Sequence, residues 1–215
     1  METLTFRPCE PRDVDAAVPL IYSSGPAAFD YAFCDSAAGQ AREFLHSAFV
    51  RNSSEFSYQQ HTAAIADGRL VGIGAVRNAT QNLRFTGAAL GRILAFYSPL
   101  AALRTVTRGL RTEQVIKPPA SGVGILYHLG VAPEYRGRGI GRQLVDQLLQ
   151  RIHTQQLPVA ALDVAESNPR ARALYEQLGF SARTLRRGTL TSAFGRVADH
   201  TYMELPLHRA LRALP

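Results

Sequence analysis

The feature that most constrains the fold is an apolar strand that passes through a turn rich in glycine and arginine into a long amphipathic helix. The strand is predicted over residues 122–131 and the helix over 139–155. Glycines let backbone N–H groups approach a phosphate closely, and the positive end of the helix dipole favours an anion there. The segment therefore predicts a site for a phosphate group at the start of this helix.

The spacing within the turn narrows the kinds of site that it could form. Its pattern is R-x-x-G-x-G, carried by Arg136, Gly139 and Gly141, and not the G-x-G-x-x-G of dinucleotide-binding folds. Arg138 and Arg142 add further charged donors beside Arg136. An ordinary tight connection between a strand and a helix has a similar composition, so a second motif is needed to assign a function.

The first third of the chain predicts the order strand, helix, helix, strand, strand. A short alternating strand covers 4–7, Pro11 opens a helix, and Ser36 is placed as the N-cap of the second helix. Two strands over 58–66 and 70–76 follow, joined by a hairpin turn that contains glycine.

The last third predicts further strands and one more helix. The nearly all-apolar stretch 158–164 is typical of a strand buried on both faces. A helix capped by Asn168 and ended by Gly179 comes next, then strands over 180–190 and 199–205. The expected fold class is α/β, with helices packed on a mixed (α+β) sheet.

Residues 78–120 interrupt this order of strands and helices, and their pattern predicts an inserted helical hairpin. Two segments with apolar residues at helical spacing are separated by Pro99, and some forty residues are too few to form a core of their own. Seven cations and one acid, Glu113, lie between Arg77 and Lys117, a net +6 out of the +7 of the chain.

This basic hairpin has three interpretations. The second helix is expected to carry a row of arginines opposite a stripe of leucines. The simplest interpretation is that the arginine face is exposed to solvent. A lid over an acceptor site comes second, and binding to a membrane surface or a nucleic acid comes third. The row consists of Arg104, Arg108 and Arg111, and the stripe of Leu100, Leu103 and Leu110.

Together with the glycine turn, a second motif makes the chain resemble the GNAT superfamily of N-acetyltransferases. The family pattern R/Q-x-x-G-x-G/A is matched by Arg136, Gly139 and Gly141. The pattern N-x-x-A-x-x-L-Y-E-x-x-G-F is matched by Asn168, Ala171, Leu174, Tyr175, Glu176, Gly179 and Phe180. The resemblance runs from the first strand to about Leu205, apart from the insertion. It implies a single GNAT acyl-CoA N-acyltransferase domain over 1–215, with 206–215 as a C-terminal tail.

The resemblance also implies a co-substrate, acetyl-CoA, and no metal. Backbone amides from Gly137 to Gly141 would hold its pyrophosphate, and main-chain groups of the preceding strand would bind its pantetheine arm beside a β-bulge. Asn168 would bond the pantetheine amides, and Tyr175 would protonate the departing thiolate. The implied cofactor-binding set is Leu129, Gly130, Val131, Arg136, Gly137, Arg138, Gly139, Ile140, Gly141, Arg142 and Asn168.

The implied reaction is acetyl transfer to a primary amine of a small molecule. The alternatives are a protein or peptide N-terminal acetyltransferase and a catalytically silent acyl-CoA-binding module. No nucleic-acid partner is expected, and homodimer formation is left open. Glu2, Arg7 and Glu10 argue against an apolar signal segment at the start, and no run of eighteen apolar residues that could span a membrane is present. Because Cys9 and Cys34 also read as reduced buried thiols, a cytoplasmic protein is expected.

No general base can be assigned from the sequence. Strict alternation along the strand 122–131 puts Ile125 and Tyr127 on the face of Leu129 and Val131, and turns His128 to the other face. Deprotonation through ordered water, with Tyr127 on the path, is an alternative. Other candidates lie at or before the second strand, namely Glu55, Tyr58 and His61.

Overall fold

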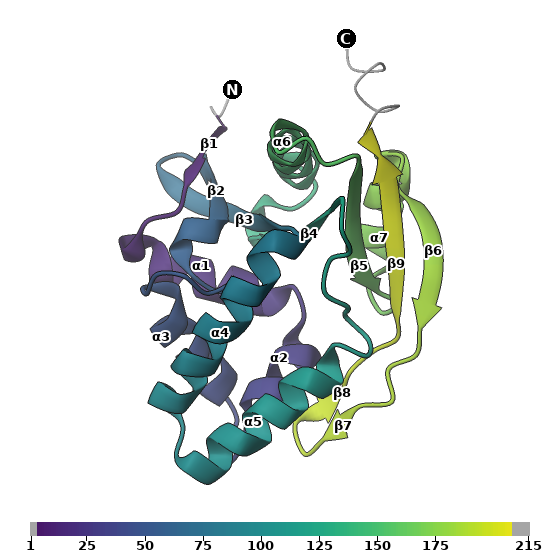
Figure 1. Ribbon diagram of the computed structural model, residues 1–215. Helices are drawn as coiled ribbons and strands as arrows, with labels where there is room; N and C mark the ends of the chain where they lie inside the picture. The colour runs from purple at the N-terminus through teal and green to yellow at the C-terminus, as the bar shows by residue number, and fades with distance from the viewer. Residues whose placement is uncertain (1–3, 208–215) are drawn as a thin grey trace.

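Seven strands form one mixed sheet in the order β1-β2-β3-β4-β5-β9-β6 (Figure 1). This computed structural model describes residues 4–207, apart from the side chain of Leu83; Glu2 and residues 208–215 of the predicted tail lie outside the described residues. The strands are β1 (Thr5–Pro8), β2 (His61–Ala66), β3 (Arg69–Arg77), β4 (Val123–Val131), β5 (Val159–Ala165), β6 (Ser181–Arg186) and β9 (His200–Pro206). The β4–β5 pair is parallel and the other neighbours are antiparallel.

Helices cover both faces of this sheet (Figure 1). They are α1 (Val14–Ser23), α2 (Pro26–Phe33), α3 (Gln40–Phe49), α4 (Ala79–Phe96), α5 (Pro99–Thr112), α6 (Ile140–Thr154) and α7 (Pro169–Gln177). Helix α6 packs on β2, β3 and β4, whereas α1 packs on β3 and β4 from the other face and in turn carries α3. The predicted mixed sheet with helices on it is therefore confirmed.

Two local predictions are wrong, and one helix was missed. Helix α3 begins after Gly39, which adopts a left-handed φ of 90°, so Ser36 is not its N-cap. Helix α2 was not predicted, although Pro26 stands at its first turn. The expected strand over 180–190 ends at Arg186, and a small hairpin follows, formed by β7 (Thr191–Ser192) and β8 (Gly195–Arg196). Each of these segments is short, so tertiary packing outweighs its own local preference.

Two hydrophobic clusters lie on opposite sides of β4. On the α1 face, aromatic rings from α2, α3 and the segment before β2 pack together, and the rings of Phe33 and Phe44 lie 4.4 Å apart. On the opposite face, Leu144 and Leu148 of α6 pack with Leu162 of β5. Cys9 and Cys34 are free and buried, as predicted.

The inserted hairpin packs on α2 and α3 in an unexpected orientation. The Tyr97 hydroxyl donates to the Phe33 carbonyl at 2.5 Å, and the small residues Ala102 and Thr105 of α5 face the interior. The leucine stripe is not the packed face of α5, because Leu100, Leu103 and Leu110 are exposed. Within residues 4–207, the helices are too short or too polar to cross a bilayer.

Candidate active site

The candidate site lies where β4 and β5 separate. The two strands pair over residues 123–125 and 159–161, and beyond this point β4 continues to Val131 with only β3 as its partner. The amide of Ala132 bonds Val71 on the β3 side, so the backbone groups of Val131 and Leu129 point toward β5. The predicted separation is present, and it leaves a strand edge that an extended molecule could pair with.

A β-bulge in β4 lies at this point and reorients the strand. Ala75 of β3 pairs with Tyr127 and Ile73 pairs with Gly130, so one residue of β3 faces two residues of β4. His128 takes a φ of 55°, a conformation that is uncommon outside glycine.

The bulge overturns the prediction that His128 points away from Tyr127. Both rings contact His61 on the α1 face, at centroid distances of 5.3 Å for His128 and 6.0 Å for Tyr127. After the bulge Leu129 instead packs toward α6, and Gly130 lies against the carbonyl of Leu20 in α1. The extra residue shifts the phase of alternation, so strict periodicity gave the wrong face.

The turn after β4 has the geometry of an anion-binding loop. Gly137 and Gly139 have left-handed φ values of 82° and 79°, and Gly139 directly precedes α6. A Cβ built at Gly139 would meet no atom within 4 Å, so the space beside its backbone is open. The first amides of α6, at Ile140 and Gly141, have no intrahelical acceptors and could bind a pyrophosphate.

Replacing Gly139 by valine is expected to weaken coenzyme A binding by roughly tenfold or more. A β-branched residue at φ 79° costs about 1–2 kcal/mol in backbone strain, and its side chain fills the open space. Calorimetry with free coenzyme A measures the change. Gly87→Val is the matched control, since Gly87 lies exposed in α4. Equal affinity in a folded Gly139→Val protein would contradict this binding site.

Other predicted cofactor residues lie in the loop, in the first turn of α6 and at the start of α7. The Nε of Arg136 donates to the Val131 carbonyl at 2.9 Å, and the guanidinium of Arg138 lies 5.0 Å from the Tyr135 ring centre. Arg142 is exposed in the first turn of α6. The Oδ1 of Asn168 caps α7 by accepting from the Ala171 amide at 3.1 Å, so its NH₂ group is the part suited to donate to a ligand carbonyl.

Tyr175 projects from α7 into the cluster that underlies β5. Its side chain is buried and its ring lies 6.0 Å from that of Phe180. Burial raises the pKa of the Tyr175 hydroxyl to about 12, so the phenol stays protonated near neutral pH. It can therefore donate a hydrogen bond, as the predicted acid role requires.

His61 and His128 form a hydrogen-bonded pair across the sheet. The Nε2 of His61 lies 3.0 Å from the Nδ1 of His128, and the Nδ1 of His61 lies 2.8 Å from the Ser57 carbonyl. The two rings differ by 4° in orientation, and Phe56 stacks on His128 at 5.7 Å. Burial lowers the pKa of His61 to about 4 and that of His128 well below its usual value. Both imidazoles are therefore neutral at pH 7.

These two histidines predict an acid-sensitive fold. The unfolded chain binds their protons near pH 6.5, above the pKa that they have when folded, so stability is complete above pH 6.5 and falls toward pH 4. His61 alone accounts for roughly 3 kcal/mol of this loss. Urea unfolding measured between pH 7 and pH 4.5 should show the slope. His61→Gln should flatten it and the exposed His153→Gln should not; an unchanged slope in both would refute the assignment.

Asp163 on β5 is a buried acid that no sequence pattern indicated. Its Oδ1 accepts from Arg186 at 2.6 Å, and Oδ2 is buried without a hydrogen-bond partner among the described residues. Burial raises the pKa of Asp163 to about 6, although Arg186 opposes this shift. Only the tertiary pairing of distant segments could reveal the role of this carboxylate, because the sequence of β5 has the pattern of a nearly all-apolar strand.

The other candidate bases are engaged elsewhere. Glu55 accepts from Arg77 at 2.6 Å, and the Tyr127 hydroxyl donates to the Glu55 carbonyl at 3.1 Å. Tyr58 packs against Phe49, with ring centres 6.4 Å apart. His128 and Asp163 therefore remain as the candidates.

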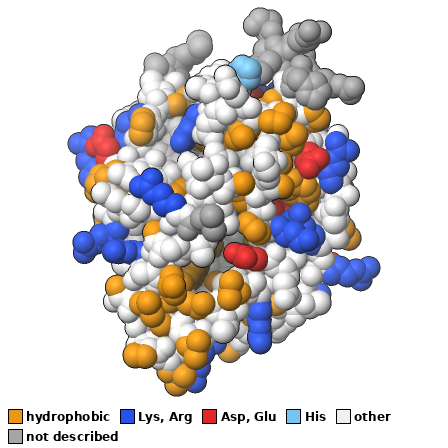
Figure 2. Space-filling view, in the orientation of Figure 1, with side chains coloured by type: hydrophobic (Ala, Val, Ile, Leu, Met, Phe, Trp, Pro, Cys, Tyr) orange, Lys and Arg blue, Asp and Glu red, His pale blue; other side chains and the backbone are white. Residues whose placement is uncertain are grey.

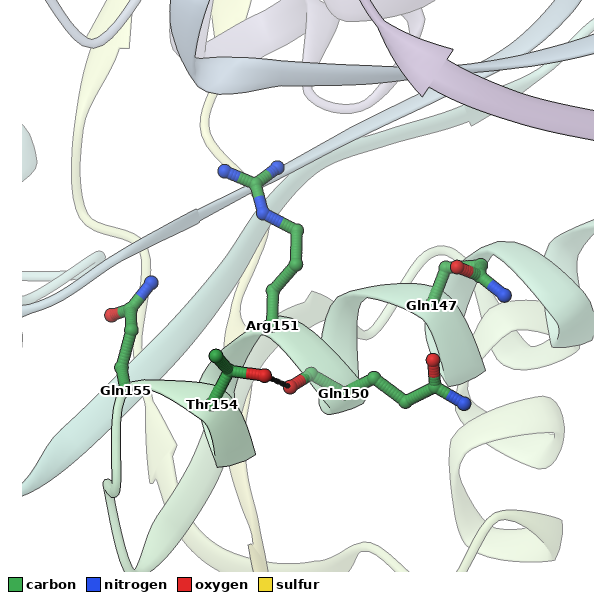
Figure 3. A pocket seen from close by; sticks show the side chains of 5 residues that line it. All are labelled: Gln147, Gln150, Arg151, Thr154 and Gln155. Atoms are coloured by element: carbon green, nitrogen blue, oxygen red, sulfur yellow. Dashed lines mark hydrogen bonds between the residues drawn. The ribbon is translucent and has the colours of Figure 1, made fainter.

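One surface depression lies away from this site. It follows the C-terminal half of α6, far along the helix from the glycine turn, and all its lining comes from that helix and its end (Figure 3). The side chains concerned are Gln147, Gln150, Arg151, Thr154 and Gln155. Across residues 4–207, three or more His, Cys, Asp or Glu side chains nowhere cluster as metal ligands would.

Comparisons with known proteins agree with this geometry. Residues 27–180 match the model of the acetyltransferase (GNAT) family. The [ribosomal protein bS18]-alanine N-acetyltransferase of Salmonella typhimurium is 38% identical over 82 residues, which are 38% of this chain and 55% of that protein. The chain thus matches about half the length of such curated relatives.

Solved structures show the same fold. An N-acetyltransferase from Staphylococcus aureus Mu50 superposes with a TM-score of 0.68 at 15% identity, covering 94% of this chain and 100% of that one. A Salmonella typhimurium protein solved with its cofactor acetyl-CoA superposes with a TM-score of 0.52 at 14% identity, covering 95% and 94%. With the family model spanning most of the sequence and the fold in agreement, this chain belongs to the acetyltransferase (GNAT) family.

Proposed function

We propose that this chain transfers the acetyl group of acetyl-CoA to a primary amine by direct attack of the amine nitrogen. The observation that carries the proposal is the course of β4, which leaves β5 at a bulge and leads, through a short turn over Pro133–Tyr135, into a glycine loop at the start of α6. A pantetheine arm could pair with the free edge at Leu129 and Val131 while its pyrophosphate meets the amides of Gly137 to Gly141.

Tyr175 acts in this proposal as the donor to the departing sulfur. A thiolate with a pKa near ~8.5 must leave when the new C–N bond forms and the C–S bond breaks. The protonated phenol lowers the energy of that thiolate by donating a hydrogen bond as the charge develops. Its surroundings support this role, because they are apolar and strengthen such a bond.

His128 acts as the base, and its hydrogen bonds support one tautomer. The Ser57 carbonyl can only accept, so the Nδ1 of a neutral His61 carries the proton and its Nε2 accepts. His128 must then donate from Nδ1, which leaves the lone pair on its own Nε2. This nitrogen takes the amine proton as the C–N bond forms and passes it to solvent.

A weak base favours a particular class of amine. The lowered pKa of His128 suits an α-amino group, of pKa about 7.7–8.0, of which about one in ten is neutral at pH 7. An alkylamine of pKa roughly 10.4 is neutral in only about one molecule in a few thousand. We therefore infer an α-amine acceptor, on an amino acid derivative or on a peptide. The name of the Salmonella relative, an alanine N-acetyltransferase, points to the same class.

Release of free thiol from acetyl-CoA across an amine panel tests the proposal. Alanine amide and a peptide with N-terminal alanine should be acetylated faster than spermidine at pH 7. Preference for the peptide over the amide would identify a peptide N-terminal acetyltransferase. Coenzyme A binding without acetylation of any amine would instead indicate a silent acyl-CoA-binding module, and faster turnover of spermidine would contradict the α-amine inference.

A further inference from the structure

Exposed leucines gather on the inserted hairpin. Among residues 4–207 six large hydrophobic side chains are exposed, and five of them belong to α4 and α5. These five, which we call the leucine patch, are Leu90, Leu94, Leu100, Leu103 and Leu110. Figure 2 shows hydrophobic side chains concentrated over the lower part of the molecule, where α4 and α5 meet in Figure 1. Such a concentration on one element marks an interaction surface.

The packing of α5 fixes the leucines outward. Its interior face carries small side chains, with Ala102 1% and Thr105 0% exposed. Arg108 donates to the Cys34 carbonyl at 2.7 Å, and Arg104 lies 3.5 Å from Asp35. A rotation of α5 that buried Leu103 would break these contacts, so the patch is a stable feature of the fold.

Positive charge borders the patch. On a helical wheel of about 100° per residue, the α5 leucines occupy an arc of roughly 80°. The three α5 arginines fill the adjoining arc of roughly 60°, so the expectation that they lie opposite the leucine stripe is wrong. Of these arginines, Arg104 and Arg111 are exposed and Arg108 is half-buried. Asp35 and Glu113 offset only part of this charge. Exposed apolar residues beside arginines suit a partner that is apolar inside and anionic at its surface.

We propose that the leucine patch docks this protein on an anionic lipid bilayer. Lipid phosphates pair with the arginines, and the leucines enter the acyl boundary as those of interfacial amphipathic helices do. A second copy of the chain fits less well, because a self-complementary contact would bring the arginine rows of both copies together. A nucleic acid has no apolar surface for the leucines once its bases are paired. The proposal does not depend on the acetyl-transfer chemistry.

Flotation of the full chain with vesicles tests this proposal. Binding is expected to vesicles of phosphatidylcholine mixed with phosphatidylglycerol, with much weaker binding to phosphatidylcholine alone. The double variant Leu94→Ser with Leu103→Ser should lower the partition coefficient by roughly tenfold or more, because the buried apolar area sets the free energy of insertion. Leu185→Ser is the matched control, because Leu185 is also more than half exposed but lies on β6.

Charge variants separate the two parts of the contact. Arg104→Gln with Arg111→Gln should weaken binding about fivefold per arginine at low salt and reduce its salt dependence, whereas the exposed Arg69→Gln at the start of β3 should not. Absence of binding to the anionic vesicles, or equal binding by the leucine variant, would overturn the proposal. If vesicle binding is missing, a dimer that sedimentation velocity detects in the wild type but not in the leucine variant would also overturn the proposal. Thiol release measured without vesicles reports separately on the proposed enzyme activity.

Discussion

Replacing Tyr175 by phenylalanine is expected to lower kcat by about 10²–10⁴-fold and to leave coenzyme A affinity nearly unchanged. The variant keeps the aromatic contact with Phe180 and removes only the hydroxyl that would donate to the departing sulfur. Burial raises the pKa of this hydroxyl to about 12, so its ionisation should not limit activity in any assay below about pH 11.

Single-turnover kinetics should be used, so that the chemical step is what is measured. Tyr31→Phe is the matched control, because it removes another buried phenol, in α2 and outside the proposed site. Equal single-turnover rates for Tyr175→Phe and wild type would exclude Tyr175 as the donor.

His128→Asn is expected to lower kcat/KM by about 10²-fold or more. Asparagine tolerates the left-handed backbone of this position, and its amide can still donate to His61, but it lacks the basic Nε2. His61→Gln should have a smaller effect, since His61 orients the base and does not itself take the proton. The acid limb of the kcat/KM profile should lie below pH 6.5 in the wild type and disappear in His128→Asn.

Asp163→Asn separates the two candidate bases. Because burial raises the pKa of Asp163 to about 6, an acid limb near pH 6 that survives in His128→Asn but vanishes in Asp163→Asn would assign the role to Asp163. Full activity of His128→Asn with α-amine acceptors would refute the tautomer argument. Far-UV circular dichroism of each variant checks that the fold is retained.

Local rules explain what the sequence predicted well. The glycine and arginine turn, the long helix after it and the Asn168 cap all depend on residues within one or two turns of each other. For the same reason Asp67 and Gly68, with φ values of 51° and 72°, form the hairpin turn expected between β2 and β3. The sheet class followed from the order of these elements.

The tertiary structure decided what depends on distant partners. His61 and His128 are 67 residues apart, and the bulge that joins them shifts the alternation of β4. Likewise, periodicity identified the leucine stripe of α5 but not its direction, which follows from the contacts of small residues and arginines with α2. A repeat along a helix gives the relative positions of side chains, whereas the side that is buried depends on the surface against which the helix packs.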